Sequence, residues 1–393
     1  MNPSKLKMGL IGGGGAGFIG RVHVTAATLD REAELVAGAF SSSPEKSKRC
    51  AAEFSVSPAR AYGSYSDLLS SENRLPSNDR IDFVTIATPN HTHADIAICA
   101  LKSGFHVICD KPMTTNLDDA RRLVETVSET GKVFVLSHNY SGYPMVRQAR
   151  EMIRNGEIGE VLAIRVAYKQ GWMHGMQAGI TPNRGAWKSD PLKNGPAGSL
   201  GDVGTHAFHL LSFITGLKPT ALMCKLKSFS SHHNLDDYGQ AIMQMSGDTM
   251  ATVMWSQVSH GRLNDLSIQI DGSKGALSWR QESPNQLIFG QLGKPTMTYD
   301  RHPSADYTTP DAKIASRLPA GHPEAFFEAF ANLYRDAYRK MRCLTASKEP
   351  QLDGVTDLCP SVWDGFDGVL FTHHCLNSNA RGCSWVNWCE DQE

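Results

Sequence analysis

The sequence predicts an α/β protein with an N-terminal doubly wound parallel sheet, followed by an α+β domain built on a large, open and mainly antiparallel sheet. Three observations predict this. A glycine-rich turn follows the first apolar run, strand and helix patterns then alternate to about residue 140, and later strand-like segments follow one another without intervening helices. We therefore expect two domains, at residues 1–140 and 141–393, the first of which has the pattern of a dinucleotide-binding domain.

Strand and helix signals alternate through the first domain. Residues 81–87 form a nearly continuous apolar run, as expected of a parallel strand that is buried on both faces. Ser43 can cap the helix that starts at Pro44. The other expected strands are residues 34–40, 105–110 and 133–138, and the expected helices are residues 43–54, 64–72, 91–102 and 117–129.

The second domain begins with a helix at 144–156 and a long strand at 161–172. A short helix at 203–216 precedes the run of strand-like segments, and residues 293–321 are expected to form a surface loop. Two helices, 322–341 and 361–376, end the expected fold. The strand-like segments are 221–229, 239–246, 250–258, 265–272, 275–281 and 286–291.

The composition limits the classes of partner. With 39 Lys and Arg against 40 Asp and Glu, the chain has no charge excess that would attract nucleic acid or an anionic membrane. No apolar run is long enough to span a bilayer, and the first residues lack a secretory signal. Nine dispersed cysteines without a C-x-x-C pair indicate reduced thiols, so we expect a cytoplasmic protein without a metal site.

The glycine-rich turn lies within residues 7–23. Gly12, Gly14 and Gly17 fit the G-x-G-x-x-G spacing, and a second register ends instead at Gly20. Glycines let the backbone turn sharply beside a helix N-terminus, which is the geometry that binds a pyrophosphate. A tight turn without a ligand is the alternative, but the position before alternating strands and helices favours nucleotide binding.

Three further segments contain residues suited to chemistry. Residues 87–93 and Lys111 each follow a predicted strand, where ligands of open α/β sheets bind. Asp202 and His206 are four residues apart, so on a helix they share one face, and an imidazole beside a carboxylate is a general base. Each segment also has a purely structural explanation. Residues 87–93 would be a capped helix start, Lys111 an ordinary lysine in a turn, and Asp202 a helix cap with His206 packed in the core.

Taken together, these motifs resemble the glucose–fructose oxidoreductase/inositol dehydrogenase (Gfo/Idh/MocA) family over most of the chain. The family implies a Rossmann domain and a domain whose open sheet often forms the oligomer interface, so we expect a homodimer or homotetramer. Its usual reaction is the oxidation of a secondary hydroxyl of a sugar or cyclitol by NAD or NADP. The motifs that support the resemblance are Gly9–Gly14 (G-L-I-G-G-G), Thr88-Pro89-Asn90 with His93, Asp110-Lys111-Pro112, and Gly201-Asp202-x-x-x-His206.

The resemblance also implies roles for single residues. Lys111 is similar to the active-site lysine, His206 to the catalytic acid/base, and Asp202 to its companion at the substrate hydroxyls. The substrate would be a neutral sugar, anhydrosugar or polyol such as an inositol. The implied cofactor-binding residues are Gly12, Gly14, Gly17, Ser41, Lys46, Thr88, Pro89, Asn90, His93, Asp110 and Asn139, and the implied substrate residues are Trp187, Lys188 and His322.

Two departures from the family pattern leave the choice between NAD and NADP open. Asp110 stands where glutamate is usual, and its shorter side chain changes the reach of the carboxylate. Ser41 stands at the end of the second strand, where NAD enzymes usually place an acid for the ribose 2′-hydroxyl. With Lys46 and Arg49 nearby, a 2′-phosphate could be tolerated, although a plain helix start explains the serines equally well.

Three other activities fit the same resemblance. Some members of the fold are glycosidases that recycle bound NAD, and some are regulators that use the cofactor pocket as a sensor. A dehydrogenase of aromatic dihydrodiols or glycosides is the third, in which Trp172, Trp187 and Trp255 would line the site. The intact set of Lys111, Asp202 and His206 argues against a regulator.

Overall fold

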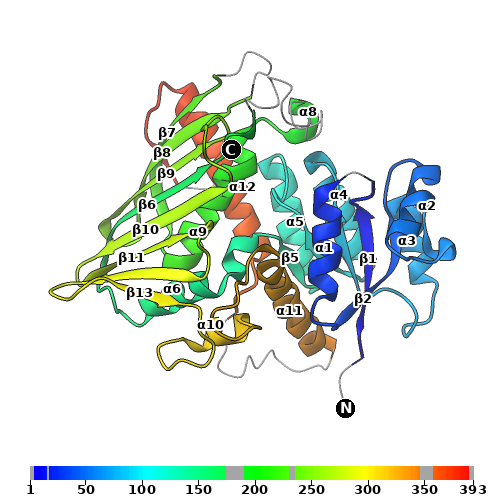
Figure 1. The fold of residues 1–393 in the computed structure, drawn as a ribbon. Coiled ribbons are helices and arrows are strands. Elements are labelled where there is room, and N and C mark those ends of the chain that lie inside the picture. Colours follow the sequence, from blue (N-terminus) through cyan, green and yellow to red (C-terminus); the bar gives the residue numbers. More distant parts are fainter. Residues whose placement is uncertain (1–3, 16, 174–189, 230–234, 346–356, 389–393) are drawn as a thin grey trace. The chain divides into compact units, whose positions relative to one another are not determined.

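The computed structural model describes residues 4–15, 17–173, 190–229, 235–345 and 357–388. Their contacts divide the chain into two compact units, shown in Figure 1. Unit 1 consists of residues 1–142 and 326–366, and unit 2 consists of residues 143–325 and 367–393.

Unit 1 is built on a five-stranded parallel sheet with the strand order β2-β1-β3-β4-β5. All five residues of β3 are buried, as the apolar run predicts for a strand covered on both faces. The strands are β1 (Leu6–Gly12), β2 (Ala33–Ala39), β3 (Phe83–Ala87), β4 (His106–Cys109) and β5 (Phe134–Leu136). The prediction of a doubly wound parallel sheet is confirmed.

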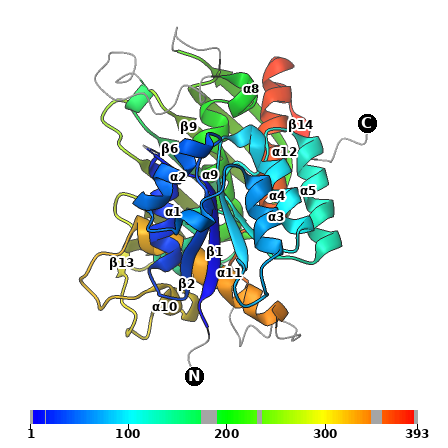
Figure 2. The same cartoon turned by 90° about the vertical axis from the view of Figure 1, so that its right-hand side faces the viewer.

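Short polar side chains start several helices of unit 1. Ser43 accepts a hydrogen bond from the Lys46 backbone N–H at 3.4 Å, and Asn116 accepts one from Asp119 at 2.9 Å, so both act as N-caps. Figure 2 shows α4 and α5 side by side. The helices are α1 (Phe18–Thr28), α2 (Pro44–Glu53), α3 (Tyr65–Asn73), α4 (His93–Lys102), α5 (Leu117–Thr130) and α11 (Phe326–Thr345), with short turns η1 (Pro58–Arg60), η2 (Asn90–Thr92) and η3 (Asn139–Gly142).

Helix α11 belongs to unit 1 although it lies nearly two hundred residues beyond the last strand of that sheet. Its Tyr334 hydroxyl lies 3.0 Å from Thr85 Oγ1 on β3 and 2.8 Å from His23 Nδ1 on α1. Tyr338 donates to the Ala27 carbonyl at 2.9 Å, and Phe330 is buried in the same core. The contiguous division expected at residue 140 therefore assigns this helix to the other domain, whereas its packing groups it with unit 1.

Unit 2 is built on a nine-stranded sheet with the order β13-β12-β11-β10-β6-β9-β8-β7-β14. Among the strand pairs that the described residues form in this sheet, only β6 and β9 run parallel, so the predicted open and mainly antiparallel sheet is confirmed. The strands are β6 (Val161–Lys169), β7 (Pro219–Lys227), β8 (Tyr238–Met245), β9 (Thr249–Ser256), β10 (Asp265–Gly272), β11 (Gly275–Arg280), β12 (Gln286–Gln291), β13 (Met297–Asp300) and β14 (Val386–Asn387).

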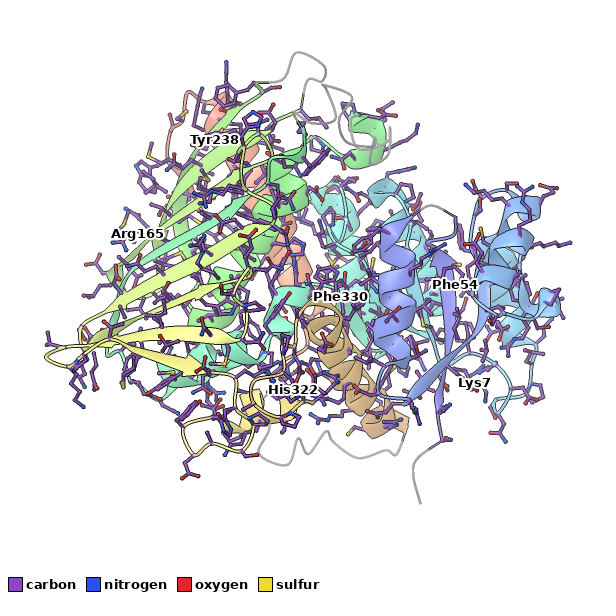
Figure 3. The ribbon with its side chains drawn as sticks, viewed as in Figure 1. Lys7, Phe54, Arg165, Tyr238, His322 and Phe330 are labelled. Atoms are coloured by element: carbon purple, nitrogen blue, oxygen red, sulfur yellow. The ribbon has the colours of Figure 1, made fainter. Side chains whose placement is uncertain are left out.

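Helices of unit 2 cover one face of this sheet. Phe208 on α9 stacks on Phe371 of α12 with ring centroids 4.5 Å apart, and Trp255 of β9 meets Phe371 edge-on. Figure 3 labels Arg165, which projects from the opposite face and is more than half exposed. The helices are α6 (Pro144–Arg154), α8 (Pro191–Asn194), α9 (Thr205–Thr215), α10 (Pro310–Ala315) and α12 (Val362–Ala380), with short turns η5 (Leu200–Gly204) and η6 (Ser246–Asp248).

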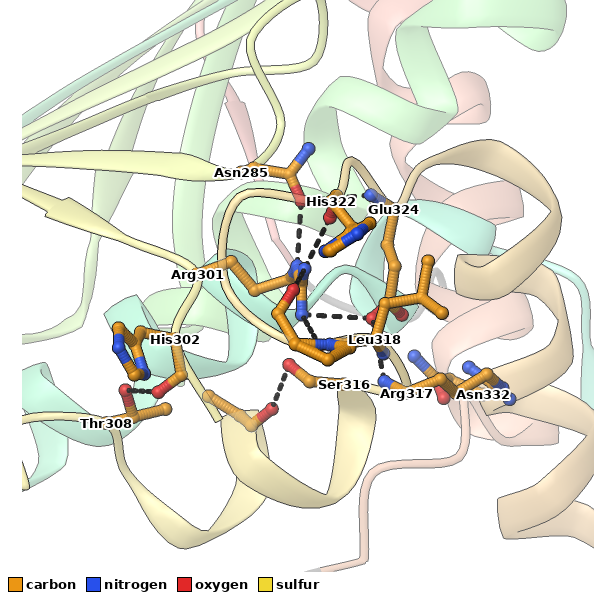
Figure 4. A network of polar contacts seen from close by, with 12 residues as sticks. Asn285, Arg301, His302, Thr308, Ser316, Arg317, Leu318, His322, Glu324 and Asn332 are labelled. Atoms are coloured by element: carbon orange, nitrogen blue, oxygen red, sulfur yellow. Dashed lines mark hydrogen bonds and ion pairs between the residues drawn. The ribbon is translucent and has the colours of Figure 1, made fainter. Parts of the chain in front are cut away.

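The surface loop expected at 293–321 is wrong in part, because it contains β13 and α10. The helix expected from His322 begins four residues later, at Phe326. Figure 4 shows the physical reason, a buried ion pair in which Arg301 Nη1 lies 3.0 Å from Glu324 Oε1. Glu324 also accepts the backbone N–H groups of Arg317 and Leu318, so the chain stays non-helical until it leaves this network.

Candidate functional site

The glycine turn of unit 1 directly follows β1. Gly12 and Gly15 have φ angles of 84° and 76°, a region that favours glycine. A Cβ atom on Gly12 would lie 2.4 Å from the Ala87 carbonyl oxygen, and one on Gly14 would lie 2.6 Å from the Phe40 carbonyl oxygen. These two positions therefore accept no side chain, and the turn keeps its backbone close to the ends of β2 and β3.

The structure distinguishes the two glycine registers. A Cβ atom on Gly20 would lie 2.3 Å from the Gly13 carbonyl oxygen, so α1 can approach the turn only because Gly20 has no side chain. A Cβ atom on Gly17 would meet nothing closer than 3.8 Å. Close packing of the helix on the turn therefore depends on Gly20, and Gly17 serves as the N-cap residue of α1.

The turn after β3 contains Thr88, Pro89 and Asn90, and His93 connects it to the next turn. The His93 ring is buried, with Nε2 2.9 Å from the Thr88 carbonyl oxygen and Nδ1 2.8 Å from the Pro112 carbonyl oxygen. Burial lowers the pKa of His93, while the Asp110 charge and the two carbonyls oppose that shift. The neutral imidazole has one N–H, so one of the two carbonyls receives a hydrogen bond, and the buried ring lies between the 88–90 turn and the turn that contains Lys111.

Lys111 follows β4 in a turn that is fixed by its neighbour. Asp110 Oδ1 accepts the Lys111 backbone N–H at 2.9 Å and the Ser137 hydroxyl at 2.8 Å. The Asp110 backbone N–H donates to the Ile86 carbonyl of β3 at 2.9 Å. The Asp110 carboxylate therefore accepts hydrogen bonds within unit 1 that set the direction of the Lys111 backbone, and the Lys111 side chain is partly exposed.

Asn139 lies in η3, just after β5. Its side chain is 2% exposed, and its Nδ2 has no hydrogen-bond partner among the described residues. A buried donor without a partner costs free energy unless a bound polar group accepts its hydrogen bond. Asn139 is therefore suited to bind a polar ligand.

In unit 2, Asp202 and His206 lie where a π-helical turn, η5, passes into α9. Asp202 Oδ2 accepts a hydrogen bond from Gln257 Nε2 at 2.7 Å. His206 is 7% exposed, and its ring centroid lies 6.1 Å from that of Tyr168 on β6. Single π-helical turns are frequent at functional sites, where they change the direction of side chains on a helix.

Asp236 fixes the start of this helical segment from a distant part of unit 2. Its carboxylate accepts the backbone N–H groups of Gly198 and Leu200, each at 2.7 Å, and the Ser199 hydroxyl at 2.6 Å. Burial raises the pKa of Asp236, and these hydrogen bonds act in the opposite direction. Residues 198–200 are thus held in place just before Asp202.

Sequence reasoning did not identify Asp236, Gln257 or Tyr334, because each acts through a partner more than thirty residues away. Of the predicted substrate residues, Trp187 and Lys188 lie outside the described residues. His322 is exposed, and its backbone carbonyl accepts a hydrogen bond from Arg301 (Figure 4). The remaining predicted residues fall into two groups, the three turns of unit 1 and the α9 segment of unit 2.

Metal-ligand clusters and membrane-spanning helices do not occur in the described part of the chain. No three His, Cys, Asp or Glu side chains among the described residues gather as metal ligands would. No helix within the described ranges has both the length and the apolar character needed to cross a membrane. The eight cysteines of the described residues are free thiols.

Comparisons with known proteins agree with this geometry. Residues 6–149 match the family described as "Oxidoreductase family, NAD-binding Rossmann fold", and residues 146–278 match the "GFO/IDH/MocA C-terminal domain". The parallel sheet of unit 1 is thus an NAD-binding Rossmann fold, and the protein is an oxidoreductase. The chain belongs to the Gfo/Idh/MocA family, which confirms the resemblance and the expected cofactor class.

Three relatives illustrate the similarity. An "inositol dehydrogenase homolog" from Azotobacter vinelandii is 34% identical in its NAD+ complex, with 98% of each chain covered and a TM-score of 0.92. Its complex with NADH and myo-inositol is 33% identical, with 98% of each chain covered and a TM-score of 0.89. "Uncharacterized oxidoreductase YfiI" of Bacillus subtilis is 29% identical over 386 residues, 98% of this chain and 97% of that protein. Levoglucosan dehydrogenase of Pseudarthrobacter phenanthrenivorans is 26% identical over 307 residues, 72% of this chain and 75% of that protein.

The residues of unit 1 fit a dinucleotide. The glycine turn lies between β1 and the start of α1, the position at which a Rossmann fold binds a pyrophosphate, and Gly12 and Gly14 allow its close packing against the ends of β3 and β2. The unpartnered Asn139 Nδ2 is a buried donor of the kind that a bound polar group satisfies. The fit therefore rests on the glycine turn and on Asn139.

Proposed function

We propose that this chain is a dehydrogenase that uses NAD or NADP to oxidise a secondary hydroxyl of a sugar, anhydrosugar or cyclitol. The observation that supports this most is the joint presence of two fixed chemical groups in a chain with an NAD-binding Rossmann fold. Lys111 follows β4 in a turn held by Asp110 and His93, and His206 follows Asp202 on α9. In such an oxidation an imidazole can act as the general base for the hydroxyl proton, and an ammonium can stabilise the alkoxide.

In this proposal each residue has one role. His206 takes the proton of the substrate hydroxyl, Lys111 stabilises the alkoxide as it forms, and Asp202 orients a neighbouring hydroxyl. The nicotinamide cofactor, when bound, supplies the hydride acceptor. General-base assistance of this kind typically contributes about 10²–10⁴-fold in rate.

The substrate class follows from the relatives and stays part of the proposal. The inositol dehydrogenase homolog was crystallised with NADH and myo-inositol, and another relative is named for levoglucosan, an anhydrosugar. Both are neutral polyhydroxy compounds with secondary hydroxyls. We therefore expect myo-inositol and levoglucosan to be informative first substrates.

We also propose that the protein acts as a homodimer or homotetramer. On the open face of the unit 2 sheet, Ile242, Met250 and Ile288 are each more than one third exposed and come from three different strands. Ile242 and Met250 lie on the neighbouring strands β8 and β9, and exposed apolar side chains on an open sheet face are typical of a protein interface. Light scattering coupled to size-exclusion chromatography tests this, and a monomer at micromolar concentration would contradict it.

The functional test measures absorbance at 340 nm with NAD+ or NADP+ and a panel of inositols, aldoses, anhydrosugars and glycosides. We expect turnover with at least one polyol, and a fall of about 10²–10⁴-fold in kcat for both Lys111→Ala and His206→Ala. Lys102→Ala and His373→Ala are the matched controls, one in each unit and each away from the motifs.

Near-normal turnover of the Lys111 and His206 variants would overturn the assigned roles. Release of a free sugar from a glycoside without a net change at 340 nm would indicate the glycosidase alternative. Cofactor binding without turnover on the whole panel would indicate a cofactor-sensing regulator.

A further inference from the structure

The face of the unit 2 sheet from which Arg165 projects has a hollow. It extends over β9, β6, β10 and β11, which are neighbouring strands of the sheet, and has a volume of about 410 Å³. Small-molecule sites typically have volumes of about 300–1,000 Å³. The described residues that line the hollow include no acidic side chain but four cationic ones, Arg165, Lys169, Arg262 and Arg280. We call it the cationic hollow.

The strand register explains the shape of the cationic hollow. Alternate residues of a strand share a face, so Arg165, Ala167 and Lys169 of β6 point to the same side. Ser267 of β10 pairs with Ala167 on one side and with Arg280 of β11 on the other. Short side chains thus lie between long cationic ones, and this difference in length leaves the hollow open.

One buried carboxylate, that of Asp265, holds three of these cations in place. The Asp265 side chain is fully buried. Its oxygens lie 3.0 Å from Arg280 Nη2, 3.1 Å from Lys169 Nζ and 3.4 Å from Arg262 Nη1. The three cationic groups are therefore kept close together although they repel one another, and a single carboxylate neutralises only one of their charges.

The fourth cation of the hollow is paired separately. Arg165 Nη1 lies 2.6 Å from Asp271 Oδ2, so this pair adds no net charge. The cationic hollow therefore has an excess of two positive charges, since three cations share Asp265 alone. These three cationic side chains are between 24% and 52% exposed, so their remaining N–H groups are accessible to a ligand.

We propose that the cationic hollow is a binding site for a small molecule that carries a phosphate group. Near pH 7 such a group has about two negative charges, which equals the excess of positive charge. Its oxygens accept charge-assisted hydrogen bonds from the guanidinium groups of Arg262 and Arg280 and from the ammonium group of Lys169. The hollow is larger than a phosphate group, so an organic part of the ligand also fits.

This site is separate from the proposed dehydrogenase reaction. Lys111, Asp202 and His206 are not among the residues that line the cationic hollow. The proposal therefore does not depend on the substrate or on the cofactor, and it can be tested without turnover.

The same sheet face has the exposed apolar side chains that we propose to contact a second copy of the chain. Two copies that meet on this face would bring two hollows of like charge toward each other, and like charges across an interface oppose binding. A phosphate group bound in each hollow removes this repulsion. We therefore expect phosphate-bearing ligands to favour the oligomer.

Isothermal titration calorimetry with pyrophosphate at low ionic strength tests the site. We expect a dissociation constant below about 1 mM for the wild type, and weaker binding as sodium chloride is added. Arg280→Gln and Lys169→Gln should each weaken binding about tenfold, the effect of losing one charge-assisted hydrogen bond. In each variant Asp265 keeps two cationic partners, so we expect the fold to persist, and circular dichroism checks this.

Two further variants complete the series. Ser278→Asp adds a carboxylate to the lining and leaves every partner of Asp265 in place, so it should weaken pyrophosphate binding without loss of stability. Lys225→Gln is the matched control, because Lys225 is an exposed lysine of β7 that does not line the hollow. It should leave the dissociation constant unchanged.

Three results would overturn the proposal, and each leaves the proposed dehydrogenase intact. The first is no binding of the wild type at about 10 mM pyrophosphate. The second is binding that Gly20→Ala abolishes and Arg280→Gln leaves unchanged, because the anion would then bind the glycine turn of unit 1. The third is a lower oligomer mass for Arg280→Gln in a phosphate-free buffer, together with no pyrophosphate binding by the wild type. In that case acidic side chains of a second copy fill the hollow.

Discussion

In unit 1 most of the candidate cofactor residues lie in turns that directly follow strands of the parallel sheet, whereas in unit 2 Asp202 and His206 lie on a helical segment that distant side chains hold. The first arrangement depends on local sequence, because a glycine turn and the end of a strand fix the backbone by themselves. The second depends on Asp236 and Gln257, which come from the segments before β8 and after β9. We therefore expect the site in unit 1 to be most sensitive to substitutions that move the backbone. We expect unit 2 to be most sensitive to the loss of single buried side chains.

The largest effect is expected for Asp236→Ala in unit 2. Removing the carboxylate leaves the Gly198 and Leu200 N–H groups and the Ser199 hydroxyl without their acceptor. Each buried donor without a partner costs about 1–3 kcal/mol, so we expect the free energy of unfolding to fall by about 3–5 kcal/mol. Urea unfolding followed by circular dichroism measures this loss.

Asp271→Ala is the control for Asp236→Ala, since Asp271 pairs with Arg165 at 2.6 Å on the exposed sheet face. A surface pair of this kind contributes less than about 1 kcal/mol. If Asp236→Ala does not fold, Asp236→Asn keeps one acceptor oxygen and should show an intermediate loss. Equal stability of the Asp236 and Asp271 variants would contradict the idea that unit 2 depends on a single buried carboxylate.

A pair of glycine variants tests the backbone in unit 1. In Gly20→Ala the new methyl group would lie 2.3 Å from the Gly13 carbonyl oxygen, so α1 must move away from the turn. We expect nucleotide affinity to fall more than about tenfold, since the turn and the helix start together form the pyrophosphate site. Gly17→Ala has room for its methyl group and should change the affinity less than about twofold. Fluorescence titration with NADH measures both, and the reverse order would restore the shorter glycine register.

The elements that the sequence predicted well are those with a local physical cause. The parallel sheet of unit 1 follows from the buried run at 81–87 and from caps such as Ser43 and Asn116. The glycine turn was predicted from the glycine spacing. Which of Gly17 and Gly20 packs against the turn depends on the approach of α1, and the spacing does not show this. Lys111 was also predicted well, because the order of strand and turn in the sequence places it after β4.

The elements that the sequence did not predict depend on long-range contacts. Nothing near residue 334 indicates that Tyr334 bonds to Thr85 and His23, so α11 could not be assigned to unit 1 from its own pattern. The Arg301–Glu324 pair delays the start of the same helix for a similar reason. The sequence around Asp236 does not distinguish it from other acids in loops, because its four hydrogen-bond donors come from residues 198–200 and from Trp255.

The smallest expected effect is a difference in how the two units respond to acid. In unit 1, burial and then the Lys132 charge lower the pKa of His106 to about 4, and its Nδ1 accepts the Val133 backbone N–H at 3.0 Å. The unfolded chain, with a histidine pKa near 6.5, binds a proton between these values that the folded chain does not, so stability falls as pH drops below about 6.5. Burial also lowers the pKa of His23 and His93, and these residues act in the same direction. From pH 7 to pH 5, His106 alone should cost unit 1 about 1–2 kcal/mol.

Asp236 in unit 2 changes the pH dependence of stability in the opposite direction to His106. Burial raises the pKa of the Asp236 carboxyl in the folded state. At a pH just above the ordinary pKa of aspartate, the folded state therefore keeps a proton that the unfolded state has released. In that pH range a lower pH favours folding. Hydrogen exchange, corrected for the intrinsic effect of pH, should therefore show protection falling at β4 and β5 between pH 7 and pH 5 while the start of α9 changes less. His106→Asn should reduce that loss in unit 1, and the exposed His322→Gln should leave it unchanged. An equal loss of protection in both units would contradict this prediction, because it would mean that acid destabilises the two units together.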